Sequence, residues 1–253
     1  MGIKEGLDQI QKYNRDVAEA ARRAEELREA GVIPWLKIAD GESVKVWYLQ
    51  ELDRGAKNYL EGNGLGFFAT EHSSPTDFKK RGTCRMDDEE RCWGCEKHKS
   101  TPWVKNAPTW KAKSKLYINV LVERKALKDS DDHKKGEVYQ EVAVLSQPNG
   151  PKAVIAPMVL DYAVENNTLT DRFWKISRKG SIAADTVYTP MVYSPSDDVN
   201  PADYADQLCD LHRCVREIPY EDQEAFFSGT PKAEPVQELA SVGAGESGPD
   251  TEW

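Results

Sequence analysis

The sequence has few cysteines and no long apolar run, and each shortage excludes a class of protein. No apolar stretch approaches the roughly 18 residues of a membrane span, and the first residues, MGIKEGLDQIQKYNRD, are charged where a signal peptide has an apolar segment. Five cysteines is an odd number, which does not suit a disulfide framework. We therefore expect a soluble cytoplasmic protein whose 253 residues bury a core without disulfides.

The sequence also lacks an overall excess of positive charge, but its charges are unevenly distributed. Residues 1–195 carry 31 Lys and Arg against 29 Asp and Glu, whereas residues 196–253 carry 3 against 14. Within the first part, residues 97–125 hold eight cations and one acid. Because a basic segment and an acidic C-terminus share one chain, the net charge of −9 does not exclude a nucleic-acid partner.

Residues 3–30 are predicted to form one helix. Apolar residues recur there at alternating steps of four and three, and Gly31 closes the helix before Pro34. Two roles suit this segment, residues 1–33: it packs on its own domain, or it is an interaction helix that touches a neighbouring copy of the protein.

After Trp35 the sequence pattern changes from that of a helix to that of β-strands. KIADGESVKVWYLQ contains an Asp40-Gly41 turn, and GFFAT, KLYINVLVERK, EVYQEVAVLSQ, RFWKISRKG and TVYTPMVYS follow. Residues 153–166 are predicted to form a helix within this series, although Pro157 falls in its first turn. Residues 200–218 are predicted to form a final helix.

Five or six strands with one inserted helix favour a mainly β fold, an OB-fold-like Greek-key barrel over residues 34–228. An antiparallel sandwich is the alternative, because strand order is not visible in sequence. Residues 229–253 are rich in Pro, Gly, Ser and Glu, and we expect them to form a disordered acidic tail.

Three of the five cysteines cluster in residues 72–98, which we expect to form a zinc subdomain. Cys92 and Cys95 form a C-x2-C knuckle, in which Gly94 eases the turn, and Cys84 and His72 precede it. Three thiolates and one imidazole complete a tetrahedral site with no open position, as is typical of structural zinc.

Two alternatives concern the neighbouring residues. His98, at C-x2-H spacing from Cys95, is the rival fourth ligand to His72. Cys209 and Cys214, together with His212, would form a second site, but buried thiols are the preferred interpretation.

A metal would also explain how such a polar segment folds. Between His72 and Cys95 the sequence has three large apolar side chains against ten or more charges, so the segment cannot bury enough surface to order itself. Zinc would supply the missing folding energy. A zinc deaminase needs His-x-Glu and Pro-Cys-x-x-Cys, and neither is present. We therefore expect no catalysis at this site.

Lysines alternate with aromatic residues directly after the knuckle, in KHKSTPWVKNAPTWKAKSKLYINVLVERK. Cations for phosphates and flat rings for unpaired bases are what a single strand requires. In LYINVLV, alternate residues from Leu116 to Val122 would face the core, whereas Tyr117 and Asn119 would face ligand or solvent. The predicted DNA contacts are Trp103, Trp110, Lys111, Lys113, Lys115, Tyr117, Arg178, Lys179 and Tyr188. The alternative is a solvated lysine face with the aromatics tucked under it.

Other aromatic residues are less clearly assigned by the pattern. Phe67, Phe68 and Tyr193 are further candidates for the DNA surface. Each of them would fit the core equally well. Trp174 and Ile176 alternate with a lysine and are assigned to the core.

These motifs resemble the zinc-containing single-stranded DNA-binding proteins of tailed bacteriophages, the T-even helix-destabilising type. The order His72, Cys84, Cys92, Cys95 resembles that family's zinc ligands, and residues 111–122 resemble its basic-aromatic strand. Residues 35–195 and the tail share its layout. The family's short basic N-terminal segment has no counterpart here, where a mixed-charge helix is predicted.

The resemblance implies sequence-nonspecific, cooperative binding of single-stranded DNA, with structural zinc and no catalysis, in the host cell cytoplasm. It implies that Lys111, Lys113 and Tyr117 contact the DNA. Such a protein coats single strands during replication, recombination and repair.

The acidic tail has its own predicted role. We expect it to compete with DNA for the binding groove and to offer its tip to replication and recombination proteins through Asp250, Glu252 and Trp253. The tip resembles those by which bacterial single-strand binders recruit their partners. The alternative is a tail that is merely solubilising.

Two other classes of function are alternatives to coating single-stranded DNA. A zinc-dependent DNA-processing enzyme would need several acidic residues close to the metal. Residues 87–90 are four consecutive acids near the predicted zinc ligands. Such a run in a loop is more often a solvated turn. A zinc-module transcription or replication accessory factor would use a recognition helix, whereas the basic stretch reads as loop and strand.

Overall fold

A computed structural model describes residues 32–88, 91–105, 107–130, 132–181, 185–195 and 199–229. The predicted N-terminal helix at residues 3–30 and the acidic tail from residue 230 onward lie outside the described residues. Within the described part, no helix combines the length and the apolar character needed to cross a membrane.

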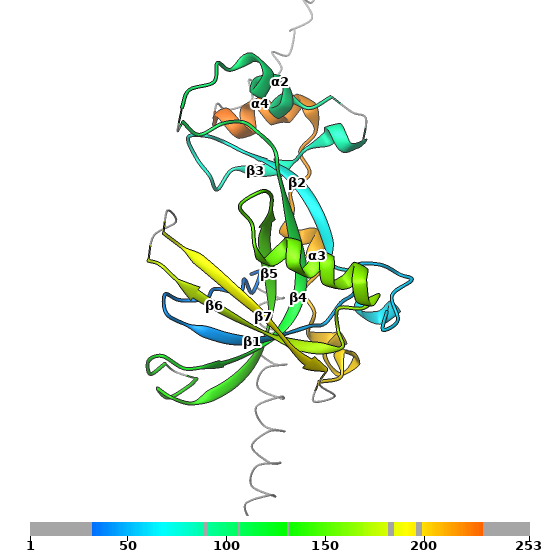
Figure 1. Cartoon of the computed structure of the whole chain (residues 1–253). Helices are drawn as coiled ribbons and strands as arrows, with labels where there is room; N and C mark the ends of the chain where they lie inside the picture. Colours follow the sequence, from blue (N-terminus) through cyan, green and yellow to red (C-terminus); the bar gives the residue numbers. More distant parts are fainter. Residues whose placement is uncertain are drawn as a thin grey trace, which may run out of the picture.

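The described chain is mainly β, as predicted, and its strands form one antiparallel sheet (Figure 1). The strand order is β3-β2-β4-β1-β6-β7, and β5 pairs with the remaining edge of β4. The strands are β1 (Ser43–Tyr48), β2 (Phe67–Ser73), β3 (Arg81–Thr83), β4 (Lys113–Lys125), β5 (Val138–Asn149), β6 (Arg172–Lys179) and β7 (Val187–Pro195).

The longest strand, β4, joins two parts of the molecule. Its first half pairs with β2, from Lys113 opposite Glu71 onward, and its second half pairs with β1. β5 follows β4 along its whole length. β2 and β4 therefore run from the main sheet into the upper part of Figure 1, where β3, α2 (Trp93–Ser100) and α4 (Tyr220–Ser228) lie together.

One face of the sheet and α3 (Ile155–Asn166) enclose the main core. Alternating apolar residues of β1, β4 and β6 point into it, including Trp174 and Ile176, so both core assignments are confirmed. The helix predicted at 153–166 is also confirmed. Pro157 is the third residue of α3, where a backbone N–H has no partner within the helix.

The opposite face of β4 is covered by residues 199–215. The single helix predicted over residues 200–218 is wrong: two short 3-10 helices, Pro201–Gln207 and Leu211–Cys214, replace it. The buried Asn119 explains the break, because its amide donates to the carbonyl of Cys209 and its oxygen accepts from the Cys209 N–H, at 2.9 and 3.0 Å. These bonds hold the backbone extended between the two turns.

Cys209, His212 and Cys214 have structural contacts that do not require a metal. His212 stacks on Phe67, with ring centroids 5.4 Å apart. Cys214 is buried in a small apolar cluster, as the preferred interpretation predicted, whereas Cys209 is only half-buried; neither cysteine forms a disulfide. Among the described residues, this trio is not one of the groups whose ligand atoms converge for a metal.

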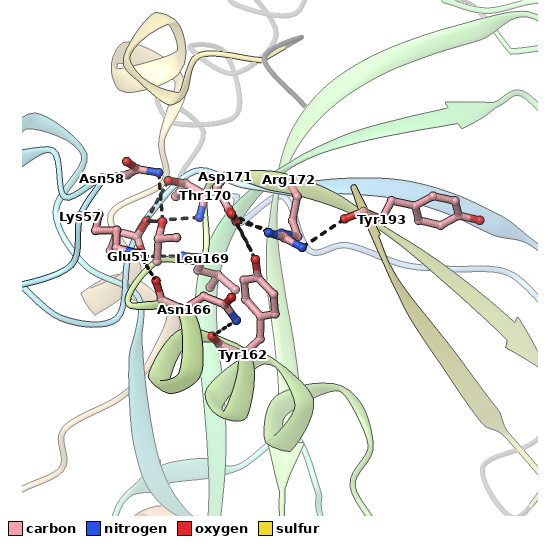
Figure 2. Close-up of polar contacts among 11 residues, drawn as sticks. Glu51, Lys57, Asn58, Tyr162, Asn166, Leu169, Thr170, Asp171, Arg172 and Tyr193 are labelled. Atoms are coloured by element: carbon pink, nitrogen blue, oxygen red, sulfur yellow. Dashed lines mark hydrogen bonds and ion pairs between the residues drawn. The ribbon is translucent and has the colours of Figure 1, made fainter. Parts of the chain in front are cut away.

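A buried carboxylate fixes the long connection between β1 and β2. Glu51 is 2% exposed, and its oxygens accept hydrogen bonds from Thr168 Oγ1, Leu169 N–H, Thr170 N–H and Thr170 Oγ1 at 2.7, 2.7, 3.2 and 2.8 Å (Figure 2). Glu51 therefore ties residues 49–66 to the turn between α3 and β6.

Candidate metal centre

Four ligand atoms converge between β2, the residues after β3, and α2. His72, Cys84, Cys92 and Cys95 each offer one atom, and these atoms all lie within 4.8 Å of one another. Cys84 Sγ and Cys95 Sγ are 3.5 Å apart, and Cys95 Sγ is 3.3 Å from His72 Nε2. Metal–sulfur bonds of about 2.3 Å in a tetrahedron place two sulfurs about 3.8 Å apart. The group therefore has the size of a tetrahedral metal site.

The structure brings His72, rather than His98, into this group. His72 is buried on β2, and its Nδ1 lies 2.6 Å from the carbonyl oxygen of Trp110. A carbonyl oxygen accepts but does not donate, so Nδ1 carries the proton and Nε2 keeps its lone pair for a metal. His98 is exposed on α2. The choice left open between the two histidines is decided by these contacts.

The knuckle is also the start of a helix. Cys92 precedes the first residue of α2, and the N–H of Glu96 donates to the Cys92 carbonyl at 3.0 Å. Gly94 lies against the imidazole: a Cβ there would approach His72 Cγ to 2.6 Å and His72 Cδ2 to 2.7 Å. Gly94 is thus required by the close approach of the His72 ring to the backbone of α2, in addition to any effect on the turn.

The C-terminal helix α4, which the sequence analysis did not predict, closes the centre. Gln223 is 1% exposed, and its Oε1 accepts from the Trp93 N–H at 2.9 Å and lies 3.7 Å from Cys92 Sγ. Phe227 stacks on Trp93 and meets the edge of Trp110, with centroids 6.0 and 5.7 Å away. We call residues 72–112 and 216–229 the metal module.

The protonation states of the thiols depend on their surroundings. Burial alone would raise the pKa of Cys92, but hydrogen bonds with His72 and with the backbone of Cys95 and Arg85 lower that pKa to about 6. Burial raises the pKa of Cys84 to about 12. Without a metal, therefore, the surroundings favour the thiolate form of Cys92 and the protonated form of Cys84.

No family model, curated protein or solved structure matches this chain.

The predicted DNA-contacting residues after the knuckle divide into two groups. Trp103 is 78% exposed, and Lys111 and Lys113 are exposed, so these three are free to meet a ligand. Lys99 and Lys105 flank Trp103 and are exposed as well. The segment between α2 and β4, which is part of the metal module, therefore presents an exposed ring among exposed cations.

Three residues of the same stretch have structural partners instead. Tyr117 was expected to face ligand or solvent, and this is wrong: it is fully buried, and its hydroxyl donates to Glu71 at 2.6 Å. Lys115 forms an ion pair with the same carboxylate at 2.8 Å. Trp110 packs on Trp93 within the metal module. The covering segment 199–215, which the strand pattern could not reveal, accounts for the burial of Tyr117.

The candidates on the last strands divide in the same way. Lys179 is exposed. Arg178 donates to the Ile38 carbonyl at 2.7 Å, and Tyr188 packs against the main core. Arg178 and Tyr188 oppose each other in the sheet, on the core side. Both side chains are half-buried and have these structural partners, so the DNA contacts predicted for them have no support here.

Replacing Gly94 by Ala is expected to weaken metal binding about 10- to 100-fold. The new methyl group would displace the His72 ring and misalign Nε2, and disturbing the orientation of a ligand typically costs this much affinity. Competition with a chromophoric chelator measures the change. Gly62→Ala is the control, since nothing lies within 4 Å of a Cβ there. Equal metal affinity in both variants would contradict the close contact.

Proposed function

We propose that this protein is a sequence-nonspecific single-stranded DNA-binding protein with a structural zinc ion and no catalytic activity. It coats and protects single strands during phage DNA replication, recombination and repair, in the cytoplasm of the host cell. The observation that carries the proposal is the exposed Trp103 among exposed lysines, on a segment anchored by a four-ligand metal centre.

Zinc is the metal that fits the ligand set. Three cysteine sulfurs and one histidine nitrogen are soft and borderline ligands at tetrahedral spacing, which suit zinc and exclude magnesium or calcium. Four protein ligands fill the tetrahedron, so no position is left for a reacting water. A structural role for the ion follows, in place of the alternative of a zinc-dependent DNA-processing enzyme.

The topology supports a barrel of the OB type. Strands β5, β4, β1, β6 and β7 are neighbours in that order, and α3 lies between β5 and β6 in the chain. Five antiparallel strands with a helix after the third are what a partly open Greek-key barrel requires. β2, β3 and the first part of the metal module, residues 72–112, are then an insertion between the barrel's first two strands, β1 and β4, whereas α4 joins the module from the end of the described chain.

The proposal predicts a strong salt dependence of DNA binding. Each phosphate that a lysine neutralises lowers log K by about 0.7 per tenfold rise in salt for single strands. Titrating a labelled oligothymidylate at several salt concentrations measures this slope. An affinity that is independent of salt, or no binding at low salt, would contradict the proposed function.

Replacing Trp103 by Ala is expected to reduce the free energy of single-strand binding by about 1 to 3 kcal/mol, the usual value of one stacked base. Because the ring is 78% exposed, the melting temperature should not change. Leu127→Ala, at a residue that is 58% exposed, is a matched control for the loss of an exposed apolar side chain. Unchanged DNA affinity in Trp103→Ala would remove this ring from the binding surface.

Deleting residues 231–253 is expected to tighten DNA binding at low salt. This segment carries five acids and one lysine, so it competes with phosphates for the same cations. The gain should shrink as salt rises, since screening weakens both interactions. If the truncated and full chains bind equally at low salt, the tail does not compete with DNA, and a recruiting or solubilising role is left for Asp250, Glu252 and Trp253.

A further inference from the structure

The outer face of β1, β6 and β7 carries aromatic and lysine side chains that the sequence analysis did not combine. Directly opposed residues of antiparallel strands share a face, and the register opposes Lys45 to Lys175 and Lys175 to Met191. Two residues further along, Trp47 opposes Phe173, whose ring stacks on Tyr193. We call this set the outer face: Lys45, Trp47, Phe173, Lys175, Met191 and Tyr193.

The rings of the outer face form a continuous row across three strands. Trp47 is 4% exposed and packs into the cluster around Tyr204. Its ring centroid is 5.6 Å from that of Phe173, and Phe173 is 4.7 Å from Tyr193 with the planes only 15° apart. The row therefore runs from a buried anchor to the edge strand β7. In Figure 2, Tyr193 points away from the Glu51 network.

The next row of the same face is open to solvent and positively charged. Met191 is 50% exposed, and the Lys45 side chain is 47% exposed. Lys45 pairs with Glu123 at 2.8 Å and lies 5.6 Å from the Phe173 ring. Lys175 lies directly opposite Lys45, and no described residue forms an ion pair with Lys175. Because Glu123 neutralises Lys45, Lys175 is the cation of this row that is left for a bound phosphate.

We propose that the outer face is a second contact surface for single-stranded DNA, an inference that rests on the proposed function. Rows on a strand are separated by two residues, about 7 Å. Because Phe173 already stacks on one side of the Tyr193 ring, a base would stack on the other side of that ring, with its phosphate within reach of Lys175. Rings beside cations are the combination that single-strand binding uses, and here the rings already lie in a parallel stack.

Photo-crosslinking tests this assignment directly. An oligothymidylate containing 5-iodouracil is irradiated with the full chain, and the crosslinked peptides are identified by mass spectrometry. We expect crosslinks at Phe173 or Tyr193 as well as at Trp103. Crosslinks confined to the metal module would overturn the outer-face proposal while leaving the proposed function intact. The absence of any crosslink, together with the absence of binding, would instead contradict the proposed function.

Substitutions give a second, independent readout. Tyr193→Ala should lower the affinity for oligothymidylate about 5- to 150-fold, whereas Tyr193→Phe keeps the ring and the affinity. Lys175→Ala should reduce the salt slope by about 0.7. Val187→Ala, at another exposed apolar residue of β7, is the control. Wild-type affinity and slope in both Ala variants would overturn the proposal. So would an effect of Tyr193→Ala that vanishes when residues 231–253 are deleted, because the face would then bind the acidic tail.

Discussion

Replacing Cys92 by Ser is expected to release the metal and unfold the metal module. Cys92 is 1% exposed and directly precedes α2, so its replacement removes a metal ligand at the start of the helix that packs against α4. Structural zinc sites contribute about 10 to 16 kcal/mol to folding in small domains. The zinc content after dialysis should fall from one ion per chain to near zero.

The unfolding should be local. The core of the main sheet and α3 does not include the metal ligands, so most of the β-sheet signal should survive. Limited proteolysis should then cut within residues 72–112 and around α4. Cys209→Ser is the matched control, because it removes a thiol that forms no disulfide and lies outside the site. Full zinc content in Cys92→Ser, or equal protease resistance of both variants, would contradict the assignment of the metal centre.

Replacing Glu51 by Ala is expected to lower the free energy of unfolding by about 3 kcal/mol or more. The substitution leaves four buried donors, from Thr168, Leu169 and Thr170, without their acceptor. Each buried donor left unpaired costs about 1 to 3 kcal/mol, reduced where water or a neighbour replaces the lost partner. At about 2 to 4 °C per kcal/mol for a domain of this size, the melting temperature should fall by roughly 6 to 12 °C.

Two variants separate the lost hydrogen bonds from the lost volume. Glu51→Gln keeps the shape and one acceptor, so its loss of stability should lie between wild type and Glu51→Ala. Glu61→Ala removes an exposed acid from the same connection and should change the melting temperature little. Equal stability of Glu51→Ala and Glu61→Ala would show that the network of Figure 2 does not hold the connection between β1 and β2.

The strands and the metal ligands could be predicted from sequence because their signals are local. Apolar alternation in β4 and β6 fixes which residues enter the core, and the cysteine spacing selects the ligands whatever surrounds them. The helix at 153–166 is equally local, since its apolar residues recur with helical period. These elements would be recognisable in many different tertiary contexts.

What could not be predicted depends on contacts between distant segments. Tyr117 is buried because residues 199–215 cross the outer side of β4, and the buried Asn119, 90 positions before Cys209, breaks the expected helix. The choice of His72 needed the carbonyl of Trp110, 38 positions away. α4 joins the metal module from more than 120 positions along the chain. No local pattern reports such pairings.

Contacts between distant segments also explain why some residues of the basic-aromatic stretch, residues 97–125, are exposed and others are buried. Alternating lysines and rings predict a binding surface, but the pattern cannot say which rings the fold needs for itself. Trp110 serves the metal module, whereas Trp103 remains exposed. The DNA surface proposed for this protein therefore rests on fewer residues of that stretch than the sequence indicated, and the outer face adds rings from strands assigned mainly to the core.

A competition titration tests the central claim most directly. The full chain, loaded with zinc, is bound to a labelled oligothymidylate at low salt and challenged with unlabelled single-stranded DNA, duplex DNA or RNA of equal length. Binding that is strong, weakens steeply with salt, and is displaced far better by single-stranded than by duplex DNA is the predicted result. Displacement by the duplex as well as by the single strand, or no binding at all, would contradict the account.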